Sequence, residues 1–237
     1  MPMSDSSNSD SRVLLITGAS SGIGEATARQ AVEAGWQVVL AARSADKLQA
    51  LVQELGVSNA MAITVDVTSY EEQVVMVETI LKHYGRLDAV FANAGTGGEA
   101  GGFSGAPVGS WETMVNVNVL GAAYTMRATL DTLKQSQGHL LLTGSVAGRR
   151  TLAGSMYSAT KWAVTAMGYG VREELRGTGV RVTLIEPGPV DTPFFDKPMD
   201  NSLMPEDVAR TVMFALSQPK HVDIHELMVL PTPAVEQ

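Results

Sequence analysis

The chain has no cysteine among its 237 residues, so disulfide bonds and thiolate chemistry are excluded. This absence fits a reducing compartment, and we expect a cytoplasmic protein. Histidine is scarce as well. The four histidines, His83, His139, His221 and His225, have no spacing typical of metal ligands, so we predict no metal site. The chain also lacks an apolar run of about 18 residues, and we expect no membrane-spanning helix.

Positive charge is in short supply. The chain has 17 Lys and Arg residues against 25 Asp and Glu, and its net charge of −8 argues against nucleic acid or an anionic membrane as a partner. Residues 1–11 are rich in Ser, Asp and Asn and have no apolar segment, so we predict a disordered tail instead of a signal peptide. Since no linker interrupts the rest, we expect residues 12–237 to form one domain.

Strand and helix patterns alternate along the chain. The apolar run Val13–Thr17 ends at a glycine, as expected for a strand buried on both faces. Further strands are predicted at 37–41, 60–65, 87–92, 139–143, 180–185 and 226–230, and helices at 23–34, 44–55 (with Ser44 as the N-cap), 69–84, 109–134, 156–176 and 205–216. Strict alternation predicts an α/β class, namely a single-domain Rossmann fold whose doubly wound, parallel, seven-stranded sheet has helices on both faces.

Functional residues should gather where these strands end, because the ligand crevice of such a sheet lies outside the carboxyl ends of its strands. The ends are followed by Gly18–Gly24, Asn93–Gly95, Ser145 and Pro187–Thr192. A glycine-rich loop is predicted at 95–105. We expect these segments to surround one site.

The first of these segments has the pattern of a phosphate-binding turn. It reads Thr-Gly-Ala-Ser-Ser-Gly-Ile-Gly over Thr17–Gly24, between the first strand and the first helix. Glycine permits positive φ and close backbone approach, and a helix N-terminus offers free N–H groups to a pyrophosphate. We therefore predict dinucleotide contacts at Gly18, Ser20, Ser21, Gly22, Ile23 and Gly24, with an ordinary tight turn as the alternative.

The end of the second predicted strand indicates which dinucleotide binds. An NAD site usually has an acidic residue there, about 20 residues after the turn, which bonds the ribose 2′-OH. This chain has Ala42 and Arg43 instead, and a guanidinium pairs well with a 2′-phosphate. We favour NADP(H) over NAD(H) as the cofactor; the alternative for Arg43 is a solvated loop charge.

Tyr157 and Lys161 lie four residues apart in the helix predicted at 156–176, shortly after Ser145. Residues i and i+4 share a helix face, so the phenol and the ammonium should lie side by side. Because a nearby cation favours the phenolate, we predict that Lys161 lowers the pKa of Tyr157 below its ordinary value of about 10. A proton donor of this kind next to a dinucleotide indicates hydride transfer.

Together these motifs resemble the short-chain dehydrogenase/reductase family over about residues 12–231. The glycine turn matches at Thr17–Gly24, and the catalytic residues of the family match Asn118, Ser145, Tyr157 and Lys161. The other matches are Asp66 and Val67 for the adenine contact, Asn93, Ala94 and Gly95 after the fourth strand, and Pro187, Gly188, Val190 and Thr192 beside the nicotinamide.

The resemblance implies an NADP(H)-dependent oxidoreductase that transfers a hydride between the nicotinamide and a carbonyl or secondary alcohol. It implies that Tyr157 is the general acid or base, that Lys161 holds the nicotinamide ribose, that Ser145 binds the substrate oxygen and that Asn118 holds a relay water. Residues 185–188 and 224–232 are similar to members that act on small hydroxy acids and related alcohols. A non-catalytic NADP(H)-sensing regulator, or a lyase or epimerase without net redox change, remains as an alternative.

Less regular positions should set the substrate and the assembly. Met156, Phe194 and Phe195 are candidates for an apolar pocket, with Phe194, Phe195 and Met199 as a small lid. Arg149 and Arg150 are candidates for meeting an acidic substrate group, with an exposed surface position as the alternative. The resemblance also implies a homotetramer or homodimer formed through the helices that carry Trp111, Met114, Trp162 and Met167; core packing is the alternative for these four.

Overall fold

The computed structural model describes residues 11–195 and 200–233. The tail predicted at residues 1–11 therefore lies outside the described residues, except for Ser11, and so does Met199 of the predicted lid.

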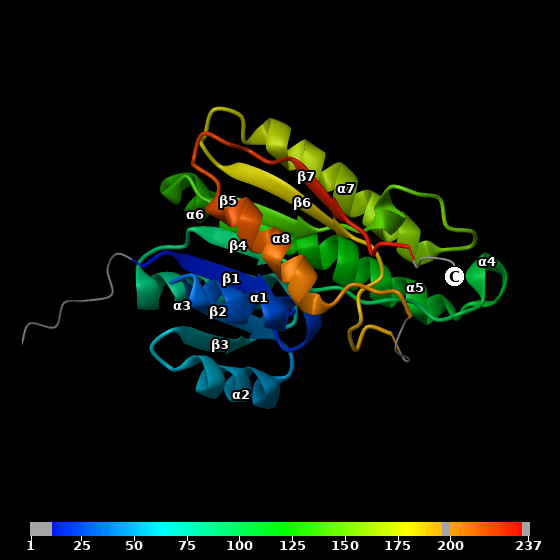
Figure 1. Cartoon of the computed structure of the whole chain (residues 1–237), viewed down its shortest axis with the longest axis horizontal. Helices are drawn as coiled ribbons and strands as arrows, with labels where there is room; N and C mark the ends of the chain where they lie inside the picture. The colour runs from blue at the N-terminus through cyan, green and yellow to red at the C-terminus, as the bar shows by residue number, and fades with distance from the viewer. Residues whose placement is uncertain (1–10, 196–199, 234–237) are drawn as a thin grey trace, which may run out of the picture.

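Within the described residues, one sheet of seven parallel strands has the order β3-β2-β1-β4-β5-β6-β7 (Figure 1). The strands are β1 (Val13–Thr17), β2 (Gln37–Ala42), β3 (Ala60–Thr64), β4 (Ala89–Ala92), β5 (His139–Thr143), β6 (Arg181–Pro187) and β7 (Glu226–Val229). The chain crosses from β3 to β4, which pairs with β1, so the order reverses between these two central strands. The ligand crevice of such a sheet lies at this reversal, and the predicted fold class is confirmed.

Helices cover both faces of the sheet, and each face has its own core. One face carries α1 (Gly22–Glu33), α2 (Ala45–Leu55) and α8 (Pro205–Ser217); the other carries α3 (Tyr70–Tyr84), α6 (Ala122–Ser136) and α7 (Met156–Glu174). Successive side chains of a strand point to opposite faces. Leu14 and Ile16 of β1 therefore pack with the first group of helices, and Val13 and Leu15 pack with the second.

The helix predicted at 109–134 is one helical stretch with a change of pitch in the middle. It consists of α5 (Val108–Met114), the π-helical segment η1 (Val115–Gly121) and α6. A π-segment takes more residues per turn, which sequence periodicity does not indicate, and such segments occur often at functional sites. Its last carbonyl, at Gly121, accepts hydrogen bonds from the side chains of Gln73 and Thr125.

Three other expectations need correction. A short helix, α4 (Gly102–Gly105), lies within the predicted loop at 95–105. Strand β6 continues to Pro187, because β7 pairs with it through Val229, so Glu186 belongs to the sheet. Ser44 stands at the N-cap position of α2, but its side chain makes no capping hydrogen bond.

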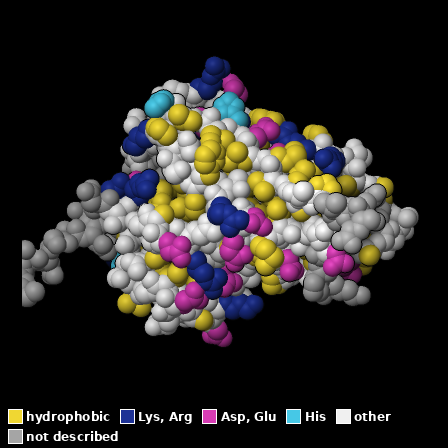
Figure 2. Space-filling model, in the orientation of Figure 1, with side chains coloured by type: hydrophobic (Ala, Val, Ile, Leu, Met, Phe, Trp, Pro, Cys, Tyr) yellow, Lys and Arg dark blue, Asp and Glu magenta, His cyan; other side chains and the backbone are white. Residues whose placement is uncertain are grey.

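Charges of both signs alternate on the surface around α1 and α8 (Figure 2). Arg29 of α1, for example, pairs with Glu25 and Glu54. Among the predicted interface residues, Met114 is 2% exposed and belongs to the interior, Met167 is partly buried against the core, and Trp162 is 46% exposed. No helix in the described ranges is long and apolar enough to cross a bilayer.

Candidate active site

The glycine-rich turn between β1 and α1 is fixed by close backbone packing. Gly18 and Gly22 have φ values of +67° and +57°, which residues with a side chain rarely adopt. A Cβ on Gly24 would lie 2.4 Å from the carbonyl oxygen of Gly18, and one on Gly18 would lie 2.9 Å from Cα of Ala94. The turn therefore lies directly against the segment after β4, with the N-terminus of α1 available to an anion.

Other predicted members of the turn have different environments. Ser21 is the N-cap residue of α1, but its side chain makes no capping hydrogen bond, and Ser20 is partly exposed. Ile23 packs against the core beneath α1. A Cβ on Gly22 would lie 2.9 Å from Cγ2 of Thr192, so the segment after β6 reaches the turn as expected.

Asn93 joins the ends of three strands. Its side-chain amide donates to the Thr17 carbonyl at 3.1 Å, and its side-chain oxygen accepts from the Thr143 hydroxyl at 3.1 Å. The Thr17 hydroxyl accepts from the backbone N–H groups of Asn93 and Ala94 at 3.0 and 3.1 Å. Asn93 and Ala94 thus tie the ends of β1, β4 and β5 together, and their predicted contact with the cofactor stays a prediction.

Asn118 lies in the π-helical segment and is 1% exposed. It pairs with Thr96, accepting from its backbone N–H at 2.8 Å and donating to its carbonyl at 2.9 Å, and it also donates to the Thr160 hydroxyl at 3.1 Å. A Cβ on Gly95 would lie 3.4 Å from the Asn118 side-chain oxygen and 3.7 Å from Lys161 Nζ. Gly95, Asn118 and Lys161, which are far apart in sequence, therefore meet at one point.

Lys161 is 4% exposed, and its ammonium donates to the Thr143 carbonyl at 2.8 Å. Burial disfavours the charged form and lowers the pKa of Lys161 to about 8. An ammonium has three N–H donors, so the bond to Thr143 leaves donors that can meet a ligand.

The predicted effect of Lys161 on Tyr157 is wrong. Burial raises the pKa of Tyr157 to about 12, and a hydrogen bond with Ser145 acts in the opposite direction without overcoming it. Lys161 Nζ lies 5.8 Å from the centroid of the Tyr157 ring and is bonded to Thr143. Desolvation of the phenolate therefore dominates the pKa of Tyr157, and the ammonium of Lys161, which is bonded to Thr143, does not offset it.

Ser145 begins a single 3₁₀ turn, η2 (Val146–Gly148), directly after β5. Its hydroxyl oxygen accepts from the backbone N–H of Ala147 at 3.0 Å. The same hydroxyl interacts with Tyr157, so the structure brings these two predicted catalytic residues together. A serine hydroxyl has one donor and two acceptor positions, and its capacity extends beyond the bond to Ala147.

Phe194 covers the Tyr157 ring. Their ring centroids are 5.6 Å apart in an edge-to-face arrangement, and Phe195 packs against Phe194 at 5.1 Å. A Cβ on Gly97 would lie 3.1 Å from the Phe194 ring. Phe194 therefore occupies the space between Tyr157 and the loop after β4, and its role as part of a lid stays a prediction.

Met156 lies beside a separate hollow. This hollow has a volume of about 370 Å³ and is lined, besides Met156, by Val108, Trp111, Glu112, Val115 and Asn116. Its walls come from α5, η1 and the start of α7, and Phe194 is not among its lining residues, so an apolar pocket shared by Met156 and Phe194 stays a prediction.

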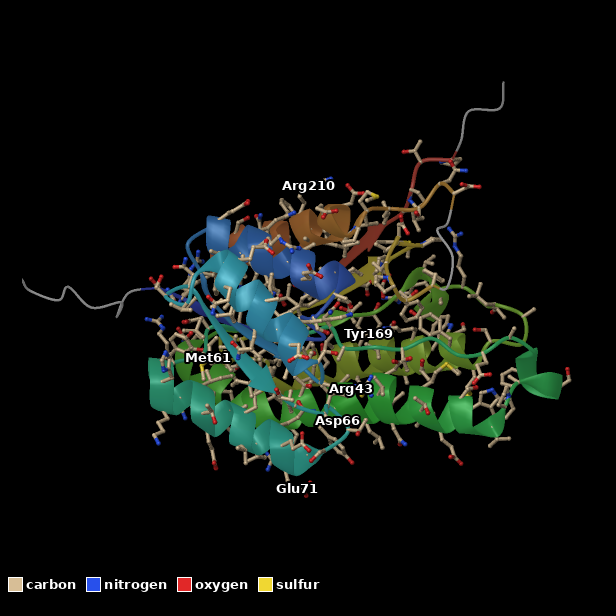
Figure 3. The ribbon with its side chains drawn as sticks, turned by 90° about the horizontal axis from the view of Figure 1, so that it is seen from below. Arg43, Met61, Asp66, Glu71, Tyr169 and Arg210 are labelled. Atoms are coloured by element: carbon tan, nitrogen blue, oxygen red, sulfur yellow. The ribbon has the colours of Figure 1, made fainter. Side chains whose placement is uncertain are left out.

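Arg43 and Asp66 lie at neighbouring strand ends, after β2 and β3 (Figure 3). The Asp66 carboxylate accepts from the backbone N–H and the hydroxyl of Thr68, at 2.9 and 2.8 Å. The bonds with Thr68 lower the pKa of Asp66, and the charge of Arg43 adds to this effect. Arg43 is exposed, which leaves it open to a ligand at the edge of the crevice.

The remaining predicted residues line the same edge. Gly188 donates to the Val229 carbonyl at 2.7 Å, directly after Pro187 ends β6, and Val190 is 5% exposed. Val67 is 8% exposed and packs on Gly121 of the π-segment. These residues shape the backbone of the crevice more than they offer polar groups to it.

The threonines that bind the candidate catalytic side chains were not identified from the sequence. Thr96, Thr143 and Thr160 contact Asn118 or Lys161 by hydrogen bonds. Only Thr143 could have been found from the sequence, because it ends a predicted strand and so belongs to the carboxyl edge of the sheet.

The Arg149 side chain is bound to Glu186 at 2.7 Å and to Glu226 at 2.5 Å, which removes it as a candidate for an acidic substrate group. Arg150 is exposed.

The described residues contain no cluster of three or more His, Cys, Asp or Glu side chains that could hold a metal ion.

Comparison with known proteins agrees with this geometry. The family described as short chain dehydrogenase matches residues 12–202. An uncharacterized oxidoreductase of Staphylococcus aureus (strain MRSA252) is 40% identical over 225 residues, which cover 93% of this chain and 97% of that protein.

Solved structures resemble the chain over nearly its whole length. An alcohol dehydrogenase from the archaeon Thermococcus sibiricus, complexed with 5-hydroxy-NADP, is 32% identical with a TM-score of 0.89, covering 96% of this chain and 100% of that one. Serine dehydrogenase from Escherichia coli is 34% identical with a TM-score of 0.85, covering 92% and 97%. A closed form of serine dehydrogenase complexed with NADP⁺ is 31% identical with a TM-score of 0.86, covering 95% and 99%. The chain therefore belongs to the short-chain dehydrogenase family and is an oxidoreductase by descent.

Proposed function

We propose that this protein reduces a carbonyl compound with NADPH, or oxidises the corresponding secondary alcohol with NADP⁺, and that Tyr157 is its acid or base. The observation that supports this most is the meeting of Asn118 and Lys161 at Gly95, on the edge of the sheet that also carries the glycine turn. A protein that only senses a dinucleotide has no use for a buried ammonium and a phenol in this place.

The turn fits a dinucleotide. Any Cβ at Gly18 or Gly24 would collide with the chain's own backbone, so glycine at these two positions lets the turn pack closely at the start of α1, whose free N–H groups suit a phosphate. The reduced nicotinamide, when bound, supplies the hydride. Lys161 would hold the nicotinamide ribose with the donors that Thr143 leaves free.

Tyr157 is suited to giving a proton. With a pKa of about 12 it is protonated at neutral pH, and carbonyl reduction needs a proton donor at the developing alkoxide. The Ser145 hydroxyl would donate to the same substrate oxygen and stabilise its charge. Tyr157 therefore carries the proton that carbonyl reduction requires.

Arg43 supports NADP(H) over NAD(H). It stands where an NAD site would have a carboxylate, and it is exposed. The similar structures with 5-hydroxy-NADP and NADP⁺ bound point the same way.

Phe194 restricts the substrate. Because its ring lies edge to face against Tyr157 and close to Gly97, we expect small compounds to reach the phenol more readily than large ones. We include serine and other small hydroxy compounds among those to test, since two of the similar structures are serine dehydrogenases.

A homotetramer or homodimer is proposed as the assembly. The indole of Trp162 on α7 and the side chain of Leu120 on η1 are exposed apolar surface, and a second copy would cover them. Light scattering of the purified protein, compared with a Trp162→Glu variant, tests this.

The test of the function is the Tyr157→Phe variant. Oxidation of NADPH is followed with a panel of small aldehydes, ketones and oxo acids, and we expect kcat to fall about 100-fold or more while NADPH affinity, measured by fluorescence, is unchanged. Tyr84→Phe is the matched control, since Tyr84 is also partly buried but lies at the end of α3. Full turnover by Tyr157→Phe would refute the assigned acid. Product formed without any net change in NADPH would instead indicate a lyase or epimerase.

A further inference from the structure

A buried carboxylate lies directly behind the candidate active site. Glu186 of β6 is 0% exposed, and its Oε1 accepts from Arg149 Nε at 2.7 Å and from the Thr165 hydroxyl at 3.4 Å. Its Oε2 is buried without a hydrogen-bond partner among the described residues. Burial raises the pKa of Glu186, and the contact with Arg149 opposes that shift. A half-satisfied buried carboxylate is costly and needs an explanation.

The partner, Arg149, connects this carboxylate to two further elements. Its Nη2 lies 2.5 Å from Glu226 of β7 and donates to the Tyr169 hydroxyl of α7 at 2.7 Å. The Tyr169 hydroxyl donates in turn to Glu226. One guanidinium therefore ties β6, β7 and α7 together.

Arg149 is also the last residue of the turn that begins with Ser145. The backbone N–H of Gly148 donates to the Ser145 carbonyl at 2.8 Å, and that of Arg149 donates to the Val146 carbonyl at 3.0 Å. Ala147 donates to the Ser145 hydroxyl. Ser145 at one end of this short turn and Arg149 at the other therefore form a single hydrogen-bonded unit.

Glu186 meets the other end of that unit as well. The backbone N–H of Gly144 donates to the Ile185 carbonyl at 2.8 Å, and a Cβ on Gly144 would lie 3.0 Å from Cγ of Glu186. On the opposite side, a Cβ on Gly148 would lie 2.7 Å from the Lys161 carbonyl oxygen. The turn is thus confined between β6 and the helix that carries Tyr157 and Lys161.

We propose that the Arg149–Glu186 pair is a positioning device that fixes the hydroxyl of Ser145 relative to Tyr157. The inference rests on the proposed function of Ser145 and Tyr157. Arg149 and Glu186 do not touch the reacting atoms; they act by fixing the turn at both of its ends. A buried ion pair adds little stability over a well-packed apolar pair, so its use here lies in setting geometry.

The sharpest test removes both charges at once. A protein with Arg149→Met and Glu186→Leu leaves neither member of the buried pair alone, and Glu226, which is partly exposed, keeps its bond from Tyr169. We therefore expect it to fold with a melting temperature close to that of the original chain. If the pair positions Ser145, kcat falls about 10-fold in this folded protein, because a small misplacement of a catalytic group is enough for such a loss. The affinity for NADPH is unchanged, since the glycine turn is not touched.

Two further variants separate positioning from stability. Arg149→Lys keeps the charge but loses the forked contacts with Glu186, Glu226 and Tyr169, and we expect kcat between those of the original and the double variant. Arg181→Met is the control, because Arg181 bonds backbone carbonyls at the other end of β6 and should lower the melting temperature without lowering kcat per folded molecule.

Hydrogen exchange gives a readout that does not need turnover. The backbone amides of Ala147, Gly148, Arg149 and Arg150 are bonded within the turn, and we expect them to exchange faster in the double variant while α7 keeps its protection. Unchanged exchange over residues 144–151 together with unchanged kcat would overturn the inference. If the original chain reduces no carbonyl compound, the proposed function fails, while the exchange experiment still decides whether the pair fixes the turn.

Discussion

Buried polar groups lie at both ends of the parallel sheet, and the groups at the two ends differ in what they bind. Each end also has a hollow of similar volume, about 370 Å³ beside Met156 and about 390 Å³ beside Arg172 and Arg181. The volume of a hollow therefore does not indicate which end of the sheet carries the candidate active site. The surroundings of the polar side chains differ between the two ends.

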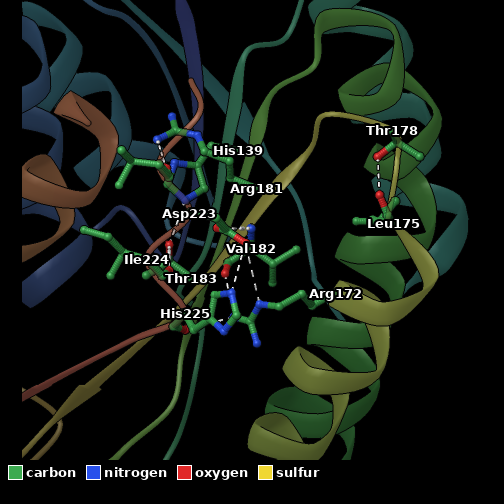
Figure 4. A network of polar contacts seen from close by, with 11 residues as sticks. His139, Arg172, Leu175, Thr178, Arg181, Val182, Thr183, Asp223, Ile224 and His225 are labelled. Atoms are coloured by element: carbon green, nitrogen blue, oxygen red, sulfur yellow. Dashed lines mark hydrogen bonds and ion pairs between the residues drawn. The ribbon is translucent and has the colours of Figure 1, made fainter. Parts of the chain in front are cut away.

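At the amino end, the cations are bonded to the chain itself (Figure 4). Arg181 donates to the carbonyls of Ala215, Gln218 and Val222, at 3.4, 3.2 and 3.4 Å, and so joins the end of α8 to the loop before β7. Arg172 donates to the carbonyls of Val182 and His225 at 2.6 and 2.9 Å. These contacts seal the ends of helices and strands, where carbonyl groups would otherwise lack partners.

At the carboxyl end, the bonding capacity is only partly used. Lys161 gives one bond to Thr143, Ser145 receives one from Ala147, and Arg43 is exposed. Unused bonding capacity alone does not mark a site, because Nδ1 of His139 and Nε of Arg172 at the amino end are also buried without a hydrogen-bond partner among the described residues. The comparison teaches that remaining donors indicate a ligand site where they lie beside a crevice that other polar groups share.

Lys161→Met should give the largest effect and tests the comparison most directly. We expect kcat to fall about 100-fold, as when one donor to a developing charge is removed. The melting temperature should be kept or raised, because a buried cation is replaced by an apolar side chain. Activity is measured with the same carbonyl panel, and stability by thermal melting. A variant that loses stability but keeps turnover would place Lys161 with the structural cations of the amino end.

The pH dependence of the free energy of unfolding tests the role of His139 at the amino end of the sheet. It is 2% exposed, its Nε2 lies 2.8 Å from the Thr183 hydroxyl, and that hydroxyl donates to the Ile224 carbonyl at 2.6 Å. Burial and the charge of Arg181 lower the pKa of His139 to about 3. Between this value and the unfolded pKa of about 6.5, only the unfolded chain binds the proton, so stability falls as the pH falls.

The expected loss from His139 alone is about 2 kcal/mol between pH 7 and pH 5. Urea unfolding at the two pH values should therefore show a smaller loss for His139→Asn than for the original chain, by about that amount. His221→Asn, at an exposed position, is the control and should leave the loss unchanged. If the original chain and His139→Asn lose the same free energy of unfolding, the His139 ring binds its proton equally well in the folded and the unfolded chain.

Arg43→Ala should give the smallest effect, because the side chain is exposed. We expect the affinity for NADPH to fall about 10-fold and that for NADH to stay the same, as fits the loss of one charge-assisted contact. Fluorescence titration measures both, with Lys134→Ala on α6 as the control. Equal affinity of the original chain for the two cofactors would show that Arg43 is only a surface charge.

Much of the fold could be predicted because its signals are local. Each strand is a short apolar run, and glycines stand near most helix ends, so the order of elements and the parallel sheet followed directly. The change of pitch at Val115–Gly121 could not be predicted, since an apolar pattern along the chain does not indicate a wider helical turn. The side-chain bonds of Asn118 in this segment go to Thr96 and Thr160, which are distant in sequence. The helical turn at α4 and the extension of β6 likewise depend on neighbours in space.

By itself, the sequence determined the class of fold, the glycine turn and the identity of the residues at the strand ends, because these follow from local periodicity and from the parallel topology that it imposes. The tertiary structure alone decided the pKa values and the ion-pair partners of these residues. Burial, and not the spacing of Tyr157 and Lys161, sets the pKa of the phenol, and it sets it in the direction opposite to the prediction. Arg149 is a candidate substrate contact in the sequence, but the packing of β6, β7 and α7 pairs it with Glu186 and Glu226 at the end of the Ser145 turn. Desolvation and long-range ion pairs depend on which segments contact each other in the fold, and the spacing of residues along the chain does not indicate these contacts.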